Sequence, residues 1–300
     1  MIPSPDNLST PPQAPKDIFP AVGCFLVFLI LIKVFLFYSL IIRYEPDSPR
    51  QGQALKIEIR GAPPWSRLAC RFKGKTYPFY ITPHGTRRAL IPIFAEWKPK
   101  TYSLEIEESG WLRWRWIDLK IPISDADFPR RKVYLPTAKM ALFSHPEASK
   151  AREDMLKALA TITPTQLWKG TFEMPVQGKV TSPYGYLRQL SRGAPWKSHL
   201  GADLGARKGS EVTAANEGVV VLAARLPLQG GVVIINHGQG VLSAYMHMSK
   251  ILIQENEFIR KGQRIGLVGS EGLSTAPHLH WGLYLWQVPI DPLEWTKHEF

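Results

Sequence analysis

Residues 195–209, PWKSHLGADLGARKG, place His199 and Asp203 four residues apart in a segment that does not suit an ordinary helix. Gly201 and Gly205 would each cost about 1 kcal/mol inside a helix. In a flat strand the side chains of His199 and Asp203 would start roughly 13 Å apart, at about 3.3 Å per residue. They can share a small target such as a metal ion only if the chain bends, and Gly201 permits a bend. A loop with a solvated His and Asp is the alternative at this point.

A second stretch, STAPHLHWGLYLW at residues 274–286, predicts a strand that carries two histidines. Strand alternation puts His278 and His280 on one face. The side chains on the opposite face are apolar: Leu279, Trp281 and Leu283. A lone His-x-His pair is more often a surface pair than a ligand pair, but His199 and Asp203 complete a set of three histidines and one carboxylate. Catalytic zinc typically has three protein N or O ligands and an open position for water, so the combination predicts a zinc site.

The segment after Gly218 predicts an all-β scaffold for these side chains. Short runs of β-branched and apolar residues are VVVLAA (219–224), VVIIN (232–236), VLSAYM (241–246) and RIGLVG (264–269). Turn signals separate them at the spacing of roughly 8–12 residues that is typical of an antiparallel sandwich or barrel. The chain contains no phosphate-binding loop, no serine nucleophile elbow and no dinucleotide-binding fingerprint that would favour another chemistry.

The segment from about Trp168 to Trp295 resembles the lysostaphin-type (LytM-like) zinc metallopeptidases, which cleave peptide cross-links in bacterial peptidoglycan. The stretches that carry the resemblance follow one another in order: GKVTSPYGYLR (178–188), HLGADLGARKGSEVTAANEGVV (199–220), VVIINHGQGVLSAYMHMS (232–249), IRKGQRIGLVGSEGLSTAPHLHWGLY (259–284) and DPLEW (291–295). The chain departs from the family pattern at Ala276, where Gly is usual, and at Gly231, where Asn is frequent.

The resemblance implies one zinc ion held by His199, Asp203 and His280, with His278 and His247 as catalytic histidines. We also expect three residues to contact the substrate: Tyr184, Arg188 and Tyr245. The function implied is a zinc-dependent endopeptidase that hydrolyses peptidoglycan cross-links with a zinc-activated water. The chain lacks the His-Glu-x-x-His motif, so a histidine would serve as base. The alternative is a non-catalytic cell-wall scaffold, or an activator of another wall hydrolase, with the same fold.

Residues 21–42, AVGCFLVFLILIKVFLFYSLII, form a long apolar run. A helix of this length spans roughly 33 Å at about 1.5 Å per residue, which is enough to cross a bilayer. No Ala-x-Ala-like cleavage site follows, so we expect an uncleaved transmembrane anchor. The basic residues after the run favour a cytoplasmic C-terminal side. A wall substrate requires the opposite orientation, and we expect a single-pass protein of the cell inner (cytoplasmic) membrane with its catalytic domain in the periplasm or extracytoplasmic space.

The sequence thus predicts a mainly β protein in four parts. They are an N-terminal segment with the anchor (1–45), a small immunoglobulin-like β-sandwich of the kind similar proteins carry (46–125), a connector with a short helix (126–165) and an antiparallel β-sandwich or barrel-like peptidase domain (166–300). In the second part, ALKIEIRG (54–61) alternates as a half-buried strand does. The Trp/Arg alternation in WLRWRWIDLKIPIS (111–124) predicts a strand with a basic solvent face, and a shift in parity between Trp116 and Ile117 predicts a bulge.

The positive charge is concentrated outside the expected peptidase domain. Residues 43–165 contain 22 Lys and Arg against 13 Asp and Glu, a net +9 of the chain's +12. An anionic wall polymer or lipid is a reasonable partner for this basic middle part, and a plain contribution to solubility remains open. No nucleic-acid-binding motif accompanies the charge, so we expect no nucleic-acid partner. Cys24 and Cys70 predict no internal disulfide.

Overall fold

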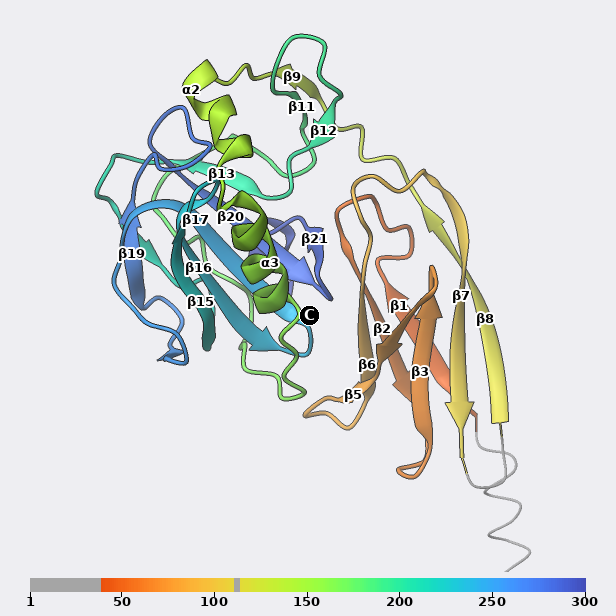
Figure 1. Cartoon of the computed structure of the whole chain (residues 1–300). Helices are drawn as coiled ribbons and strands as arrows, with labels where there is room; N and C mark the ends of the chain where they lie inside the picture. Colours follow the sequence, from red (N-terminus) through yellow and green to blue (C-terminus); the bar gives the residue numbers. More distant parts are fainter. Residues whose placement is uncertain (1–38, 111–113) are drawn as a thin grey trace, which may run out of the picture. The chain divides into compact units, whose positions relative to one another are not determined.

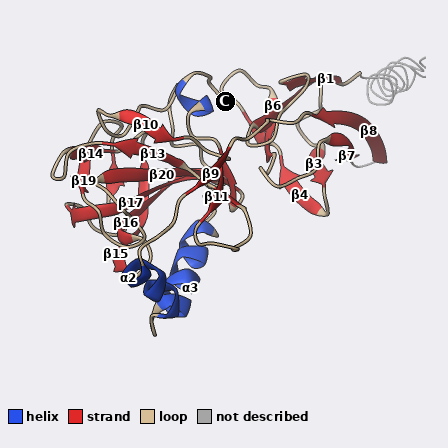
Figure 2. Cartoon of the chain, turned by 90° about the horizontal axis from the view of Figure 1, so that it is seen from above, coloured by secondary structure: helices blue, strands red, loops and turns tan. Residues whose placement is uncertain are grey.

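The computed structural model describes residues 39–110 and 114–300 (Figure 1). Residues Ile41–Phe300 form one compact unit. This unit is built mainly from β-strands, as the sequence predicts, and its helices are few and short beside them (Figure 2).

Residues 41–123 form two four-stranded antiparallel sheets. The first contains, in order across the sheet, β1 (Ile41–Glu45), β2 (Ala54–Arg60), β6 (Arg87–Pro92) and β5 (Tyr80–Ile81). The second contains β4 (Lys75–Pro78), β3 (Arg67–Phe72), β7 (Lys100–Ser109) and β8 (Trp114–Ile123). Alternation in β2 buries Leu55, Ile57 and Ile59, because one face of the strand packs on the core. The assignment of this part to an immunoglobulin-like module stays a prediction.

Two predictions about β8 are wrong. The strand pairs with β7 in a continuous register from Trp114 to Ile123, without a bulge. Its solvent face carries tryptophan: Trp114 and Trp116 are 67% and 48% exposed. Arg115 points to the other face, where its guanidinium binds Glu108 at 2.7 Å, and the carboxylate of Glu108 is buried. Ile121 and Ile123 have the same parity as Arg115 and are buried, so the apolar residues of β8 share its inward face with this ion pair.

The C-terminal part is built around a ten-stranded antiparallel sheet. Seven strands follow one another across it: β10 (Lys179–Ser182), β13 (Ala202–Gly205), β20 (His278–Leu285), β17 (Val241–Ile251), β16 (Gly230–Gly238), β15 (Gly218–Leu226) and β18 (Phe258–Ile259). Three more pair alongside: β14 (Glu211–Thr213), β19 (Arg264–Val268) and β21 (Val288–Ile290). A 3-10 helix, η2 (Glu294–Thr296), follows and buries Trp295 in the core.

Both faces of this sheet are covered, which explains the uninterrupted apolar run of β16. All nine residues of β16 are buried. Val233 and Ile235 belong to the main core, which also contains Trp281. Val232 and Ile234 belong to a second core on the opposite face. A strand buried on both faces is hydrophobic at every position instead of alternating.

The second face is covered by the connector. After β9 (Arg130–Lys132) the connector forms α2 (Thr137–Met140), the 3-10 helix η1 (Ala141–Ser144) and α3 (Ala148–Leu159). Met155, Ala158 and Leu159 of α3 pack against the second core, and the helix lies over the sheet in Figure 1. The segment that we expected only to connect two domains therefore completes the packing of the sheet.

The prediction of a transmembrane helix over 21–42, and with it the inner-membrane localisation, is corrected. Ile41 and Ile42, which end the predicted span, lie in β1 and pair with β2. No helix in residues 39–110 and 114–300 is both long enough and apolar enough to cross a membrane. Residues 21–38 of the predicted span lie outside the described residues.

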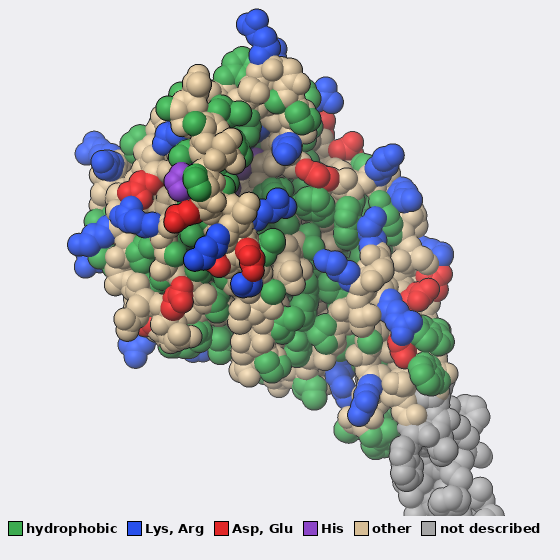
Figure 3. Space-filling model, viewed as in Figure 1, with side chains coloured by type: hydrophobic (Ala, Val, Ile, Leu, Met, Phe, Trp, Pro, Cys, Tyr) green, Lys and Arg blue, Asp and Glu red, His purple; other side chains and the backbone are tan. Residues whose placement is uncertain are grey.

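The basic charge is not gathered into one patch on the face that Figure 3 shows. Lys and Arg side chains are spread over that face, with Asp and Glu side chains among them. Several basic residues of the two four-stranded sheets are paired, as Arg71 is with Glu107 at 2.8 Å and Lys56 with Glu45 at 3.1 Å. Binding of an anionic polymer or lipid at this part stays a prediction.

Candidate functional site

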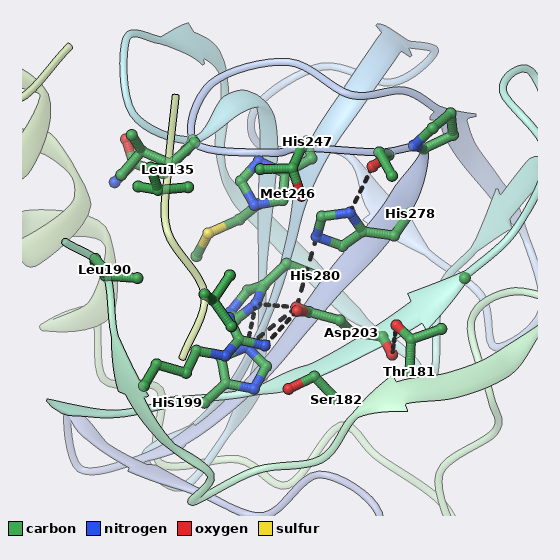
Figure 4. A pocket seen from close by; sticks show the side chains of 18 of the residues that line it. Leu135, Thr181, Ser182, Leu190, His199, Asp203, Met246, His247, His278 and His280 are labelled. Carbon is green, nitrogen blue, oxygen red and sulfur yellow. Dashed lines mark hydrogen bonds and ion pairs between the residues drawn. The ribbon is translucent and has the colours of Figure 1, made fainter. Parts of the chain in front are cut away.

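Three of the predicted site residues meet where two neighbouring strands lie beside the loop that precedes one of them. Asp203 of β13 lies directly opposite His280 of β20 in the antiparallel register. His199 precedes β13, and the bend at Gly201 turns its ring back to the same point. Asp203 Oδ1 lies 3.0 Å from His199 Nε2 and 2.9 Å from His280 Nδ1, and the two ring nitrogens are 3.0 Å apart (Figure 4). The bend predicted from the two glycines thus brings the His-x-x-x-Asp pair together.

The geometry of these three donor atoms suits a small tetrahedral metal ion. Zinc bonds of about 2.0–2.1 Å at tetrahedral angles put neighbouring ligand atoms roughly 3.3 Å apart. The three observed distances are close to that value, and the three atoms form a group that could hold a metal ion. His199 Nδ1 lies 3.0 Å from the carbonyl oxygen of Pro183, which can only accept, so Nδ1 carries the proton and Nε2 keeps the lone pair with which it could bind a metal ion. Two imidazoles and a carboxylate are ordinary zinc ligands.

The electrostatics of the site keep these side chains in the form that binds a cation. Burial by itself would raise the pKa of Asp203, but its hydrogen bonds with His199 and His280 outweigh that effect and hold the pKa well below its usual range. Burial lowers the pKa of His280, which favours the neutral ring. The carboxylate is therefore ionised and the imidazole is neutral, as metal ligation requires.

His247 and His278 lie beside this group with one ring nitrogen free. His247 Nδ1 donates to the carbonyl of Glu271 at 2.8 Å, and His278 Nδ1 donates to the carbonyl of Ala276 at 2.8 Å. Each Nε2 therefore keeps its lone pair, and His278 Nε2 lies 3.6 Å from Asp203 Oδ1. The centres of the His247 and His278 rings are 4.9 Å apart. The structure thus brings all five predicted histidine and aspartate positions into one place.

Burial favours the neutral state of the His247 and His278 rings. It lowers the pKa of His247 to about 3, with smaller contributions from His280 and His278. Burial also lowers the pKa of His278, although the charge of Asp203 acts in the opposite direction.

His247 has a left-handed backbone conformation, with φ of 65°, which is rare for a residue other than glycine. Its backbone N–H donates to the carbonyl of Gln229 at 2.7 Å, which holds this conformation.

Gly201 is required for packing as well as for the bend. A Cβ at this position would lie 2.7 Å from His280 Nε2 and 2.6 Å from the carbonyl oxygen of Trp281. We expect Gly201→Ala to displace the His280 ring and to weaken zinc binding by roughly 10–100-fold, the effect of disturbing the surroundings of a ligand. Competition with a chromophoric chelator would measure the affinity. Gly282→Ala, on the strand that carries His280, is the control, since the nearest neighbour of a Cβ there is the side chain of Tyr284 at 3.0 Å. Equal affinities for both variants would contradict this account.

The three predicted substrate contacts have different positions. Arg188 reaches the site, where its Nη2 lies 2.5 Å from Asp203 Oδ2, the carboxylate oxygen turned away from the histidines. Tyr184 is 2% exposed, and its hydroxyl donates to the carbonyl of Pro289. Tyr245 is fully buried, and its hydroxyl is hydrogen-bonded to Ser243 and to the N–H of Ala215. Both tyrosine rings are buried and hydrogen-bonded within the protein, and their contact with the substrate stays a prediction.

The five residues open into a cleft of about 520 Å³, called the histidine cleft below. Its walls come from the sheet, from the loop before β20 and from the connector. The lining residues besides the site histidines and Asp203 include Thr181, Ser182, Arg188, Leu190, Leu228, Gln229, Met246, Leu273, Arg131, Val133 and Leu135. Sequence reasoning missed the last three, which lie in the connector. The alternation in RRKVYL (130–135) was the available signal for a strand there.

Comparisons with known proteins agree with this geometry. Residues 197–292 match the family model described as Peptidase family M23, which supports the resemblance to LytM-like peptidases in this part of the chain. Peptidoglycan DD-endopeptidase ShyA of Vibrio cholerae serotype O1 is 38% identical over 96 residues, which are 32% of this chain and 22% of ShyA. Murein hydrolase activator EnvC of Escherichia coli (strain K12) is 35% identical over 127 residues, which are 42% of this chain and 29% of EnvC.

A solved structure resembles most of the described chain. A peptidase M23 from Pseudomonas aeruginosa superposes with a TM-score of 0.63 at 20% sequence identity, covering 83% of this chain and 95% of that one. At this identity the likeness concerns the fold alone. The matches to ShyA and EnvC span less than a third of either protein.

Proposed function

We propose that this protein is a zinc-dependent endopeptidase that hydrolyses the peptide cross-links of bacterial peptidoglycan. The observation that carries the proposal is the group of His199, Asp203 and His280, which has the donor atoms and spacing for zinc, flanked by two histidines with free Nε2 atoms. The match to peptidase family M23 supports it, and the similarity to ShyA supports a peptidoglycan substrate.

In the proposed hydrolysis, the residues of the site bind, transfer protons and orient one another. Zinc, when bound, would supply a Lewis acid and a water of lowered pKa. His278 offers Nε2 to take the proton of the attacking water, while Nδ1–H stays bound to the Ala276 carbonyl. The imidazolium that forms is stabilised by that carbonyl and by Asp203, 3.6 Å away. His278 can then return that proton to the departing amine, either directly or by passing it to the free Nε2 of His247. Arg188 holds Asp203 Oδ2, which leaves Oδ1 directed at the ligand group.

A second candidate function is activation of another wall hydrolase. The relative EnvC is named as an activator, and it matches the chain over 127 residues. The complete ligand group and the two positioned histidines favour the enzyme, because an activator needs neither. The two functions differ in what the purified chain does alone.

The test is digestion of purified sacculi by the full chain, followed by fragment analysis. The zinc-loaded protein alone should release new peptide fragments, a chelator should abolish the release, and added zinc should restore it, because the ligand group depends on the ion for its chemistry. Release that appears only when a second wall hydrolase is present would favour the activator. Digestion that survives complete removal of metal would overturn the zinc mechanism.

A further inference from the structure

The connector strand contributes alternate side chains to the histidine cleft. Residues 129–135 are joined to 187–190 by backbone hydrogen bonds, from Leu187 N to Pro129 O at 2.9 Å through to Leu135 N to Leu190 O at 3.0 Å. β9 pairs in parallel with β11 (Leu187–Gln189), which also pairs with β12 (Lys197–Ser198). Arg131, Val133 and Leu135 line the cleft, whereas the residues between them do not. This is the period of two that a strand imposes on its side chains.

Two arginines lie next to each other on this wall. Arg131 of β9 and Arg188 of β11 are partners in the parallel register, and both line the cleft. Adjacent guanidinium groups on one face of a sheet repel one another unless anions neutralise them. Arg188 has its anion, the carboxylate of Asp203. Within the described residues, the Arg131 guanidinium forms no ion pair, and its one hydrogen bond is to the carbonyl of Thr181 at 3.4 Å.

The position of Thr181 places this guanidinium beside the metal ligands. Thr181 lies on β10, where the next residue, Ser182, pairs with Asp203 of β13. The Thr181 hydroxyl also donates to the backbone carbonyl of Asp203 at 3.1 Å. Arg131 therefore reaches the strand that adjoins the ligand strand. Asp203 is the one acidic residue among those that line the cleft, and it is already bound by Arg188.

We propose that Arg131 is a specificity-determining residue that binds a free carboxylate of the peptide substrate close to the scissile bond. The proposal rests on the proposed endopeptidase function and adds to it the chemical class of the substrate, an anionic peptide. A guanidinium binds a carboxylate through two parallel N–H···O bonds, and an amide in its place provides one acceptor and no charge. A site built to pair with a charged group discriminates strongly against the neutral analogue.

The experiment uses the zinc-loaded full chain and two synthetic cross-linked stem peptides. The peptides are identical except that the carboxylate next to the scissile bond is free in one and a carboxamide in the other. The wild-type chain should prefer the free acid. Arg131→Gln should raise KM for the acid roughly tenfold or more, the usual effect of losing a charge-assisted hydrogen bond, with kcat nearly unchanged. The loss should be confined to the acid, so that the variant no longer distinguishes the two peptides.

Arg130→Gln is the matched control, because it removes the same charge from the same strand. Arg130 does not line the cleft, and its guanidinium lies over the Trp196 ring, 5.9 Å from its centre. This variant should keep the wild-type preference. Arg131→Lys, which keeps the charge without the planar fork, should be intermediate. Zinc content and melting temperature are measured for each variant, so that a folding defect is recognised.

Two outcomes would overturn the proposal. One is an equal loss on both peptides by Arg131→Gln, which would mean a structural role, and the other is an unchanged preference in that variant. Failure of the proposed function looks different, since the wild-type chain would then cleave neither peptide. In that case the equilibrium binding of both peptides is measured for the wild type and for Arg131→Gln. Tighter binding of the free acid by the wild type alone would support the carboxylate site. Equal binding of the two peptides by the wild type would refute that site.

Discussion

His280→Ala should lose both the bound zinc and the hydrolytic activity. His280 Nδ1 lies 2.9 Å from Asp203 Oδ1 and 3.0 Å from His199 Nε2, so its removal leaves two protein ligands where catalytic zinc requires three. The fall in affinity should exceed the 10–100-fold that disturbing an outer partner causes. Metal analysis of the purified variant, together with digestion of a peptide substrate, measures both losses.

The fold should survive this substitution. His280 faces the cleft, while its neighbours Leu279 and Trp281 fill the core and keep β20 in place. Circular dichroism and the melting temperature in the presence of a chelator would compare the folds without a contribution from the metal. His298→Ala is the control, because His298 is exposed and lies outside the cleft. A His280→Ala variant that binds zinc as tightly as the wild type would refute the ligand assignment.

His278→Ala should keep the metal and lose activity by roughly 10²–10⁴-fold, the contribution of a positioned acid or base. Its Nδ1 is bound to the Ala276 carbonyl, so the ring can offer only Nε2 to the reacting groups. His247 has the same arrangement with the Glu271 carbonyl, and His247→Ala should behave alike. Zinc content and turnover of all three histidine variants form one experiment.

The experiment separates ligands from proton-transfer groups. Loss of zinc in His278→Ala, with zinc retained in His280→Ala, would reverse the two assignments. Full activity in His278→Ala would instead leave His247 as the base. The variants at positions 278 and 247 also test whether the two rings act in one step. If they do, the double variant should lose little more activity than either single variant.

The residues of the site could be predicted from the sequence because they occur in two short motifs whose spacing is typical of metal ligands. One motif is His-x-x-x-Asp with glycines, and the other is His-x-His at the start of an amphipathic strand. Together they leave few interpretations other than a metal site. The partner of Arg188 could not be predicted, because its contact with Asp203 depends on how β11 lies beside β13. The burial of Tyr184 and Tyr245 could not be predicted for the same reason, because a tyrosine in a motif looks the same in the sequence whether its ring fills the core or faces a cleft.

The role of the connector could not be predicted either. The sequence predicts a short helix in the connector, but nothing in the residues says that α3 covers the second face of the sheet or that β9 forms a wall of the cleft. Both are contacts between segments far apart in the chain. A region bounded at residue 166 would lack that wall and would expose the apolar side chains beneath α3, including Val232 and Ile234. The proposed catalytic unit therefore extends to include residues 126–165.

The left-handed backbone at His247 lowers the stability of the fold at a proposed catalytic residue. A left-handed conformation costs a residue with a Cβ about 1–2 kcal/mol, and glycine would avoid that cost. Glycine would also remove the imidazole whose Nδ1 is anchored on Glu271. A redesign for thermostability that replaced left-handed residues by glycine would include this position, and would discard the proposed catalytic group. Position 247 should therefore be held fixed in any effort to engineer a hardier variant.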